Sequence, residues 1–91
     1  MKTNKTIRIE EVADINFDYS YLEVFYLESS QPFLDIGITD KKELIFKFYP
    51  VPEEINLSVM NLEYILNTAK AFLPKALKDE EDFLTFNENT K

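Results

Sequence analysis

Hydrophobic residues change their period about two thirds of the way along the chain, and this change limits the folds that the chain can adopt. Between Thr6 and Leu57, apolar and polar residues mostly alternate, which is typical of β-strands with one buried face. After Ser58, apolar residues recur at helical spacing. The sequence therefore predicts an α+β fold, with an antiparallel β-meander of about five strands and one C-terminal amphipathic helix packed on one face.

The strands are predicted from the alternating segments and the turn residues between them. We expect strands at 6–10, 21–28, 33–39 and 43–49, and a short further strand at 55–57. Residues 14–21 also alternate strictly, but the phase slips after Ser20. A bend or bulge near Tyr19–Tyr21 would explain that slip. Pro50 and Pro52 end the run of longer strands.

The register of the middle hairpin can be predicted because paired residues must point to the same face. A three-residue loop at 40–42 places residue 39 opposite residue 43. This register pairs 38 with 44, 36 with 46 and 34 with 48, all of them apolar. It also sets Asp35 opposite Lys47 on the other face, where the two charges attract.

The C-terminal third is predicted to be helical, with Ser58 as the N-cap. Pro74 is expected to stop or kink this helix, because proline lacks an amide hydrogen. The acidic run Asp79–Asp82 then suits the first turn of a short second helix. The apolar stripe of the first helix consists of Leu62, Ile65, Leu66, Ala69, Phe72 and Leu73.

The length of 91 residues indicates a single domain, 1–91, with 1–5 and 87–91 expected to be frayed at its ends. The sequence contains no cysteine, which fits a reducing compartment. Residues 1–11 contain no apolar stretch of signal-peptide length, and no apolar run approaches the roughly 20 residues that span a bilayer. These features together predict a cytoplasmic protein.

The net charge of −7 is unevenly distributed along the chain. The stretch 9–40 contains eight acidic residues and no lysine or arginine. Such a stretch repels nucleic acid and anionic membranes, and it attracts a basic partner. The alternative is that the acidic surface only keeps the protein soluble. The eight residues are Glu10, Glu11, Asp14, Asp18, Glu23, Glu28, Asp35 and Asp40.

Several catalytic groups are missing from the sequence. Without histidine or cysteine, the chain lacks the usual general base, nucleophilic dyads and zinc ligands. Its single glycine, Gly37, cannot build a phosphate-binding loop. A carboxylate pair could act as in glycosidases, but 17 acidic residues make accidental pairs inevitable and no substrate cleft is implied. Asp79–Asp82 or the pair Asp35 and Asp40 could bind a hard cation, but neither has the calcium-loop spacing with its central glycine. We therefore expect no enzyme activity, cofactor or metal.

One face of the predicted sheet is wholly apolar and suits the helix, whereas the other mixes aromatic rings with carboxylates. That mixture is typical of protein-binding surfaces, since aromatic rings bury much area and acids steer a basic partner. Alternatively, the N-terminal strands or a second copy of the chain cover this face. The candidate partner-binding residues on this face are Tyr21, Glu23, Phe25, Phe33, Asp35 and Tyr49. Asp14, Asp18 and Tyr19, which precede the strand 21–28, are second-tier candidates.

Four segments resemble small immunity proteins of bacterial contact-dependent growth inhibition and other polymorphic toxin systems. They are 32–36 (PFLDI), 43–50 (ELIFKFYP), 62–66 (LEYIL) and 69–74 (AKAFLP). The resemblance implies a cytosolic antidote that binds a basic toxin domain, often a nuclease, and blocks its active site or substrate access. It implies a monomer in a 1:1 complex, with a homodimer as the alternative. A secretion chaperone or a nucleic-acid-mimic inhibitor remains an alternative function.

Overall fold

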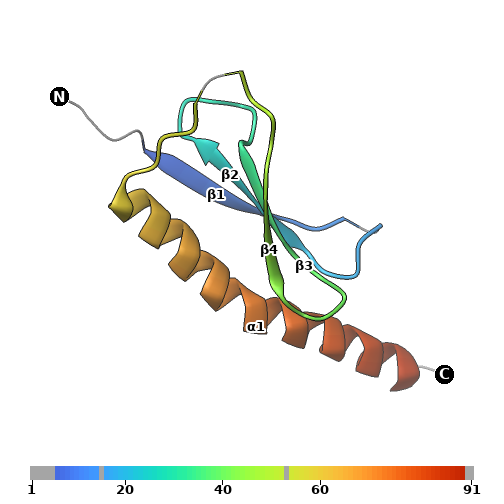
Figure 1. The fold of residues 1–91 in the computed structure, drawn as a ribbon. Coiled ribbons are helices and arrows are strands. Elements are labelled where there is room, and N and C mark those ends of the chain that lie inside the picture. The colour runs from blue at the N-terminus through green and yellow to red at the C-terminus, as the bar shows by residue number, and fades with distance from the viewer. Residues whose placement is uncertain (1–5, 15, 53, 90–91) are drawn as a thin grey trace.

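The structure is an antiparallel sheet with a single long helix along one face (Figure 1). This computed structural model describes residues 6–14, 16–52 and 54–89, with side chains described as far as Asp82. The predicted α+β class and C-terminal helix are therefore confirmed. The elements are β1 (Ile7–Val12), β2 (Tyr21–Tyr26), β3 (Leu34–Ile38), β4 (Leu44–Phe48) and α1 (Val59–Asn89).

The sheet is a simple meander in the order β1-β2-β3-β4, with every neighbouring pair antiparallel. The predicted register of the β3–β4 hairpin is confirmed at every position, including Asp35 opposite Lys47. Its loop closes through the amide of Thr39, which donates to the carbonyl of Glu43 at 2.8 Å. Lys42 in this loop has a φ of 66°, in the left-handed region.

The hydrophobic core lies between the sheet and α1. From the helix, Ile65, Ala69, Phe72 and Ala76 are buried at spacings of four, three and four residues. This seam is narrower than the predicted stripe, because Leu62 and Leu66 remain 45% and 37% exposed. The buried core residues of the sheet side are Ile7, Leu22, Val24, Phe33, Leu34 and Ile36.

The segment 14–21 alternates in sequence, but residues 16–20 form a turn and loop that lead into β2, which begins at Tyr21. Asp14 explains the difference. Its side-chain Oδ1 accepts a hydrogen bond from the amide of Asn16 at 2.9 Å, and its carbonyl accepts one from the amide of Phe17 at 3.0 Å. Aspartate makes such local bonds at the expense of strand pairing. Hence the phase slip marks a loop between two strands rather than a bulge.

The short strand predicted at 55–57 is also absent, so the described residues form four strands where about five were expected. Ile55 and Leu57 still pack against the core. Pro50 and Pro52, which lack amide hydrogens, precede this segment and limit its capacity for strand pairing. The segment is therefore held by packing and by one hydrogen bond, from the amide of Asn56 to the hydroxyl of Tyr26.

The helix begins as predicted, with the Ser58 hydroxyl accepting from the amide of Asn61 at 3.0 Å. Pro74, however, lies inside α1 and does not end it. Phe72 and Ala76, on either side of this proline, are both buried against the sheet. Their burial favours continuation of the helix. Pro74 has no amide hydrogen to donate to the carbonyl of Lys70, but both residues face solvent. Tertiary packing thus outweighs the local preference.

The acidic run 79–82 does not start a second helix, because it lies within α1. Asp79 and Asp82 instead form i, i+4 ion pairs with Lys75 and Lys78, each at 3.5 Å. Of the tail expected to fray, 87–89 is helical, while 90–91 and the N-terminal 1–5 lie outside the described residues. In the part of the chain that is described, α1 has no apolar stretch long enough to cross a membrane.

Candidate functional site

Charged residues cross the sheet in a single row on the face opposite α1. Glu10 of β1 pairs with Glu23 of β2, Glu23 with Asp35 of β3, and Asp35 with Lys47 of β4. The residues on either side of Glu23 and Asp35 point to the other face, into the core, and are Leu22, Val24, Leu34 and Ile36. We call Glu10, Glu23 and Asp35 the acid row. Like charges directly opposite each other destabilise a sheet, so this arrangement is costly to the fold.

Basic residues neutralise the two ends of this row more than its middle. Arg8, two residues before Glu10 on the same face, forms an ion pair with it at 2.8 Å. Lys47 lies next to Asp35 at the other end, but no ion pair within 4 Å joins them. Among described residues, Glu23 and Asp35 have no ion-pair partner. The negative potential is therefore greatest at the centre of the face.

The environment of Glu23 makes ionisation unfavourable. Partial burial raises the pKa of its carboxyl above the usual 4.5, and the neighbouring charges of Asp35 and Glu10 raise it further. A positive group placed over the row would reverse the electrostatic part of this shift. Glu23 is thus a carboxylate whose charge is better tolerated in the presence of a cation than in the free protein.

Two tyrosines lie beside Asp35. The Tyr49 hydroxyl donates a short hydrogen bond to Oδ2 of Asp35, which, with burial and nearby negative charge, raises the pKa of Tyr49 to about 12. Burial and the charges of Glu23, Asp35 and Asp14 raise the pKa of Tyr21. Oδ1 of Asp35 is buried and has no hydrogen-bond partner among the described residues. The burial of this acceptor is therefore not compensated by a hydrogen bond in the free protein.

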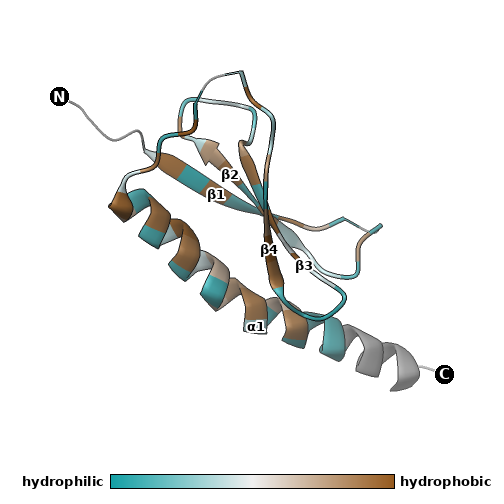
Figure 2. Ribbon diagram, viewed as in Figure 1, coloured by the Kyte–Doolittle hydropathy of each residue, from teal (hydrophilic) through white to brown (hydrophobic). Residues whose placement is uncertain are grey.

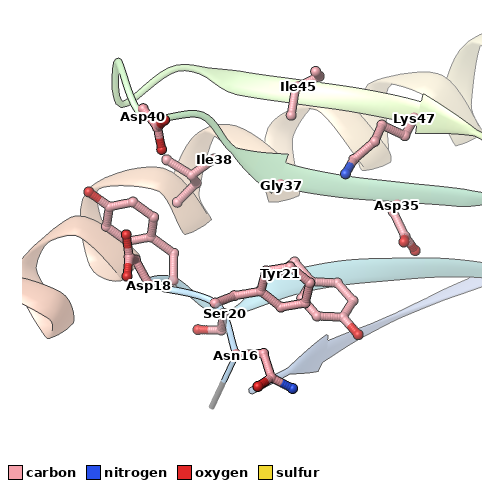
Figure 3. A pocket seen from close by; sticks show the side chains of 12 residues that line it. Asn16, Asp18, Ser20, Tyr21, Asp35, Gly37, Ile38, Asp40, Ile45 and Lys47 are labelled. Carbon is pink, nitrogen blue, oxygen red and sulfur yellow. The ribbon is translucent and has the colours of Figure 1, made fainter. Parts of the chain in front are cut away.

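A cavity of about 320 Å³ lies between the loop 16–21 and the open face of β3 and β4 (Figure 3). We call it the loop–sheet cavity. Its loop side includes the rings of Phe17 and Tyr21, which meet edge to face at a centroid distance of 5.8 Å. Its sheet side includes Asp35, Gly37 and Lys47. The cavity therefore combines aromatic walls with carboxylates, and it adjoins the acid row at Asp35.

Most of the predicted partner-binding residues gather in this region. Asp18, Tyr19, Tyr21 and Asp35 line the loop–sheet cavity. Glu23 and Tyr49 lie next to Asp35, through the strand pairing and the hydrogen bond described above. Asp14 stands at the start of the loop and is close enough to affect the pKa of Tyr21.

The two predicted phenylalanines lie elsewhere, because Phe25 and Phe33 are only 5% and 3% exposed. Phe33 belongs to the core and stacks on Tyr26 at 4.7 Å, so its assignment to the open face is wrong. Phe25 does face away from α1, but the guanidinium of Arg8 covers its ring at 4.1 Å. Arg8 is held there by the carbonyls of Leu27 and Ser29, each at 3.0 Å. Neither ring offers a contact surface to a partner.

Eight residues that line the cavity were not predicted as binding residues. They are Asn16, Phe17, Ser20, Gly37, Ile38, Asp40, Ile45 and Lys47. The confirmed hairpin register already placed Lys47 and Gly37 on the same face as Asp35. A glycine in the middle of a strand is itself a signal of a close approach or an open space. The closeness of residues 16–20 to the sheet could not be predicted, since the alternating pattern of 14–21 does not indicate the turn at Asp14.

Comparison with protein-family models, with curated proteins and with solved structures gives no match. The described residues contain no group of three or more potential metal-ligating side chains with suitable placement. The physical description of the site, from the acid row and the loop–sheet cavity, is therefore the basis for the function proposed below.

Proposed function

We propose that this chain is an acidic binding protein, without enzymatic activity, that docks a basic protein on the sheet face opposite α1. The observation that carries the proposal is the acid row, in which Glu23 and Asp35 face each other and, among the described residues, neither forms an ion pair. Such a row costs free energy in the isolated protein. A basic partner turns that cost into attraction, and it also accelerates the encounter of the two proteins.

The partner class that fits best is a basic toxin domain, and we propose that the chain is its cognate immunity protein in the cytoplasm. A nuclease must present positive charge to bind phosphates. An acidic face of matching size would occupy that surface and block the active site or the access of substrate. The resemblance of segments 32–36, 43–50, 62–66 and 69–74 to immunity proteins of polymorphic toxin systems supports the same proposal.

The tyrosines of the face complement its charge. Tyr49 is 36% exposed and Tyr21 is partly exposed, so both rings can contribute contact area while the Tyr49 hydroxyl stays bonded to Asp35. Aromatic residues of this kind are enriched among the residues that dominate binding energy. The expected complex is 1:1, with steering by the acid row and contact area from the rings.

Co-expression with the product of the adjacent reading frame tests the proposal. We expect a tight 1:1 complex, and we expect its association rate to fall about tenfold or more between 50 mM and 500 mM salt. The double variant E23Q/D35N should slow association further, while the matched variant E28Q, which removes a charge outside the acid row, should change it less than twofold.

A neighbouring gene product that is harmless to cells lacking this chain would contradict the immunity function. An association rate independent of salt would contradict docking through the acid row. Each result leaves a different part of the proposal standing, since the first concerns the identity of the partner and the second concerns the surface.

A secretion chaperone is the second candidate, and one observation favours it. The first turns of α1 expose apolar side chains, with Val59 and Met60 73% and 74% exposed, and Figure 2 shows the first turn in brown. Such a surface suits a homodimer. Light scattering distinguishes the two functions, because a stable dimer favours the chaperone and a monomer favours the immunity protein. Inhibition of an unrelated nucleic-acid-binding enzyme would instead indicate a nucleic-acid mimic.

A further inference from the structure

Gly37 occupies the middle of β3, where a glycine weakens the strand, and nothing in the fold requires it there. Its φ is not positive, so its backbone conformation is open to any residue. A Cβ atom added at this position would meet Cγ2 of Ile45 at 3.7 Å, which is ordinary van der Waals contact. What the glycine does provide is space, because it forms part of the sheet wall of the loop–sheet cavity.

The polar groups around this space select for positive charge. Three carboxylates line the loop–sheet cavity, from Asp18, Asp35 and Asp40, against the single ammonium group of Lys47. The Oδ1 atom of Asp35 has no donor, while its Oδ2 atom is held by Tyr49. The carboxylate is therefore fixed in place in the cavity wall, with one buried acceptor that no described donor satisfies, and its negative charge favours a cationic donor beside it.

The aromatic walls narrow the ligand further. Phe17 and Tyr21 meet edge to face in the cavity wall, and Phe17 is 60% exposed, so a planar group can reach an aromatic surface there. A guanidinium stacks on aromatic rings and hydrogen-bonds carboxylates with a rigid fork, whereas an ammonium group does neither as well. The cavity volume of about 320 Å³ is sufficient for one long side chain.

We infer that the loop–sheet cavity receives an arginine side chain of the basic partner, with the guanidinium between the aromatic wall and Asp35. The inference rests on the proposed function and specifies its central contact. Gly37 leaves room for the aliphatic stem. The ammonium group of Lys47 repels the incoming guanidinium and so lowers its affinity for the cavity. It also disfavours cationic ligands that cannot form hydrogen bonds with the carboxylates.

The test uses the full chain and N-acetyl-arginine amide, with N-acetyl-citrulline amide as the neutral control of nearly the same shape. In an NMR titration we expect the arginine compound to shift the amide signals of Tyr21 and Gly37, with an affinity in the roughly millimolar range for a single side chain. Citrulline should cause no saturable shift. Equal shifts with both compounds, or shifts spread over all acidic residues, would overturn the inference.

Variants of the cavity give the second readout. G37V fills the space and should weaken arginine binding at least tenfold, and D35N should do the same by removing the fixed carboxylate. E28Q, with the same loss of charge outside the cavity, should stay within twofold of the wild type. K47M should strengthen binding. Thermal melting checks that each variant folds, and G37A, whose Cβ fits, replaces G37V if the larger side chain prevents folding.

Docking on the acid row and the arginine contact in the loop–sheet cavity can be refuted separately. If a folded G37V protein binds the co-expressed partner as tightly as the wild type, the arginine contact is wrong while docking on the acid row stands. If the arginine compound binds the wild type and not G37V, yet E23Q/D35N leaves the salt dependence of partner association unchanged, docking on the acid row is wrong instead. Unchanged arginine binding in folded G37V overturns the cavity inference whatever the partner does.

Discussion

Glu23 shows how a single carboxylate can be unfavourable for the fold of the free protein. Its folded-state pKa is raised, so the folded protein holds the proton more tightly than the unfolded chain does. The contribution to stability is fully present below the unfolded value of 4.5, and it is lost as pH rises through the raised folded value. Ionised Glu23 therefore destabilises the free protein at neutral pH.

The variant E23Q should raise the midpoint of thermal unfolding at pH 7 by roughly 2–5 °C, because it removes the repulsion by Asp35 and Glu10. At pH 4 the difference from the wild type should largely vanish, since Glu23 is then protonated. Thermal melts at both pH values measure this. E28Q, which lies in the turn after β2, should show a shift of less than about 1 °C at either pH.

Lys42 is the residue whose backbone is least suited to its side chain. Its φ of 66° lies in the left-handed region, which glycine adopts without steric cost. K42G should therefore increase the free energy of unfolding by about 0.5–1 kcal/mol. K41G removes the same charge from the same loop, where no positive φ occurs, and should be destabilising. Urea unfolding of the two variants gives the comparison, and equal effects would contradict the backbone argument.

At the scale of the elements, Pro74 offers a direct test of how packing holds α1 together. P74A restores an amide hydrogen in the helix interior, at an exposed position between buried Phe72 and Ala76. We expect the free energy of unfolding to rise by about 1–2 kcal/mol, since the gain in helix formation exceeds the added freedom of the unfolded chain. Lower stability in urea unfolding would show that Pro74 has a specific role in the fold.

The seam between α1 and the sheet provides a matched pair of substitutions. Ile65 is fully buried, whereas Leu62, one turn earlier, is 45% exposed. I65A should destabilise the protein by about 3 kcal/mol and L62A by less than about 1 kcal/mol. Chemical unfolding measures both. Similar losses at the two positions would mean that the helix buries a wider face than the structure indicates.

The elements differ in how far they could be predicted from the sequence. The β3–β4 hairpin was predictable to the residue pair, because a short loop and a strict alternation leave one register. The loop 14–20 was not, because alternation there is overruled by hydrogen bonds of Asp14. The same holds for Pro74, where burial on both sides overrules a local preference. The acidic character of the site could be predicted from the sequence. The loop–sheet cavity could not, because it depends on where the loop between β1 and β2 lies.

At the scale of the whole molecule, the long helix makes the protein elongated. Its radius of gyration is 15.5 Å, whereas a compact chain of this length has about 12 Å. Small-angle X-ray scattering should give a value close to 15.5 Å that does not depend on protein concentration. A value that grows with concentration would indicate self-association, with the exposed start of α1 as the surface to mutate first.

The position of β4 at one end of the meander has a consequence for solubility. An outermost strand offers free amide and carbonyl groups to other chains, and β4 carries Leu44, Phe46 and Phe48. Lysines at 41 and 42 precede it and prolines at 50 and 52 follow it, which are residue types that discourage intermolecular strand growth. The free edge of β4 is thus flanked on both sides by residues that discourage aggregation.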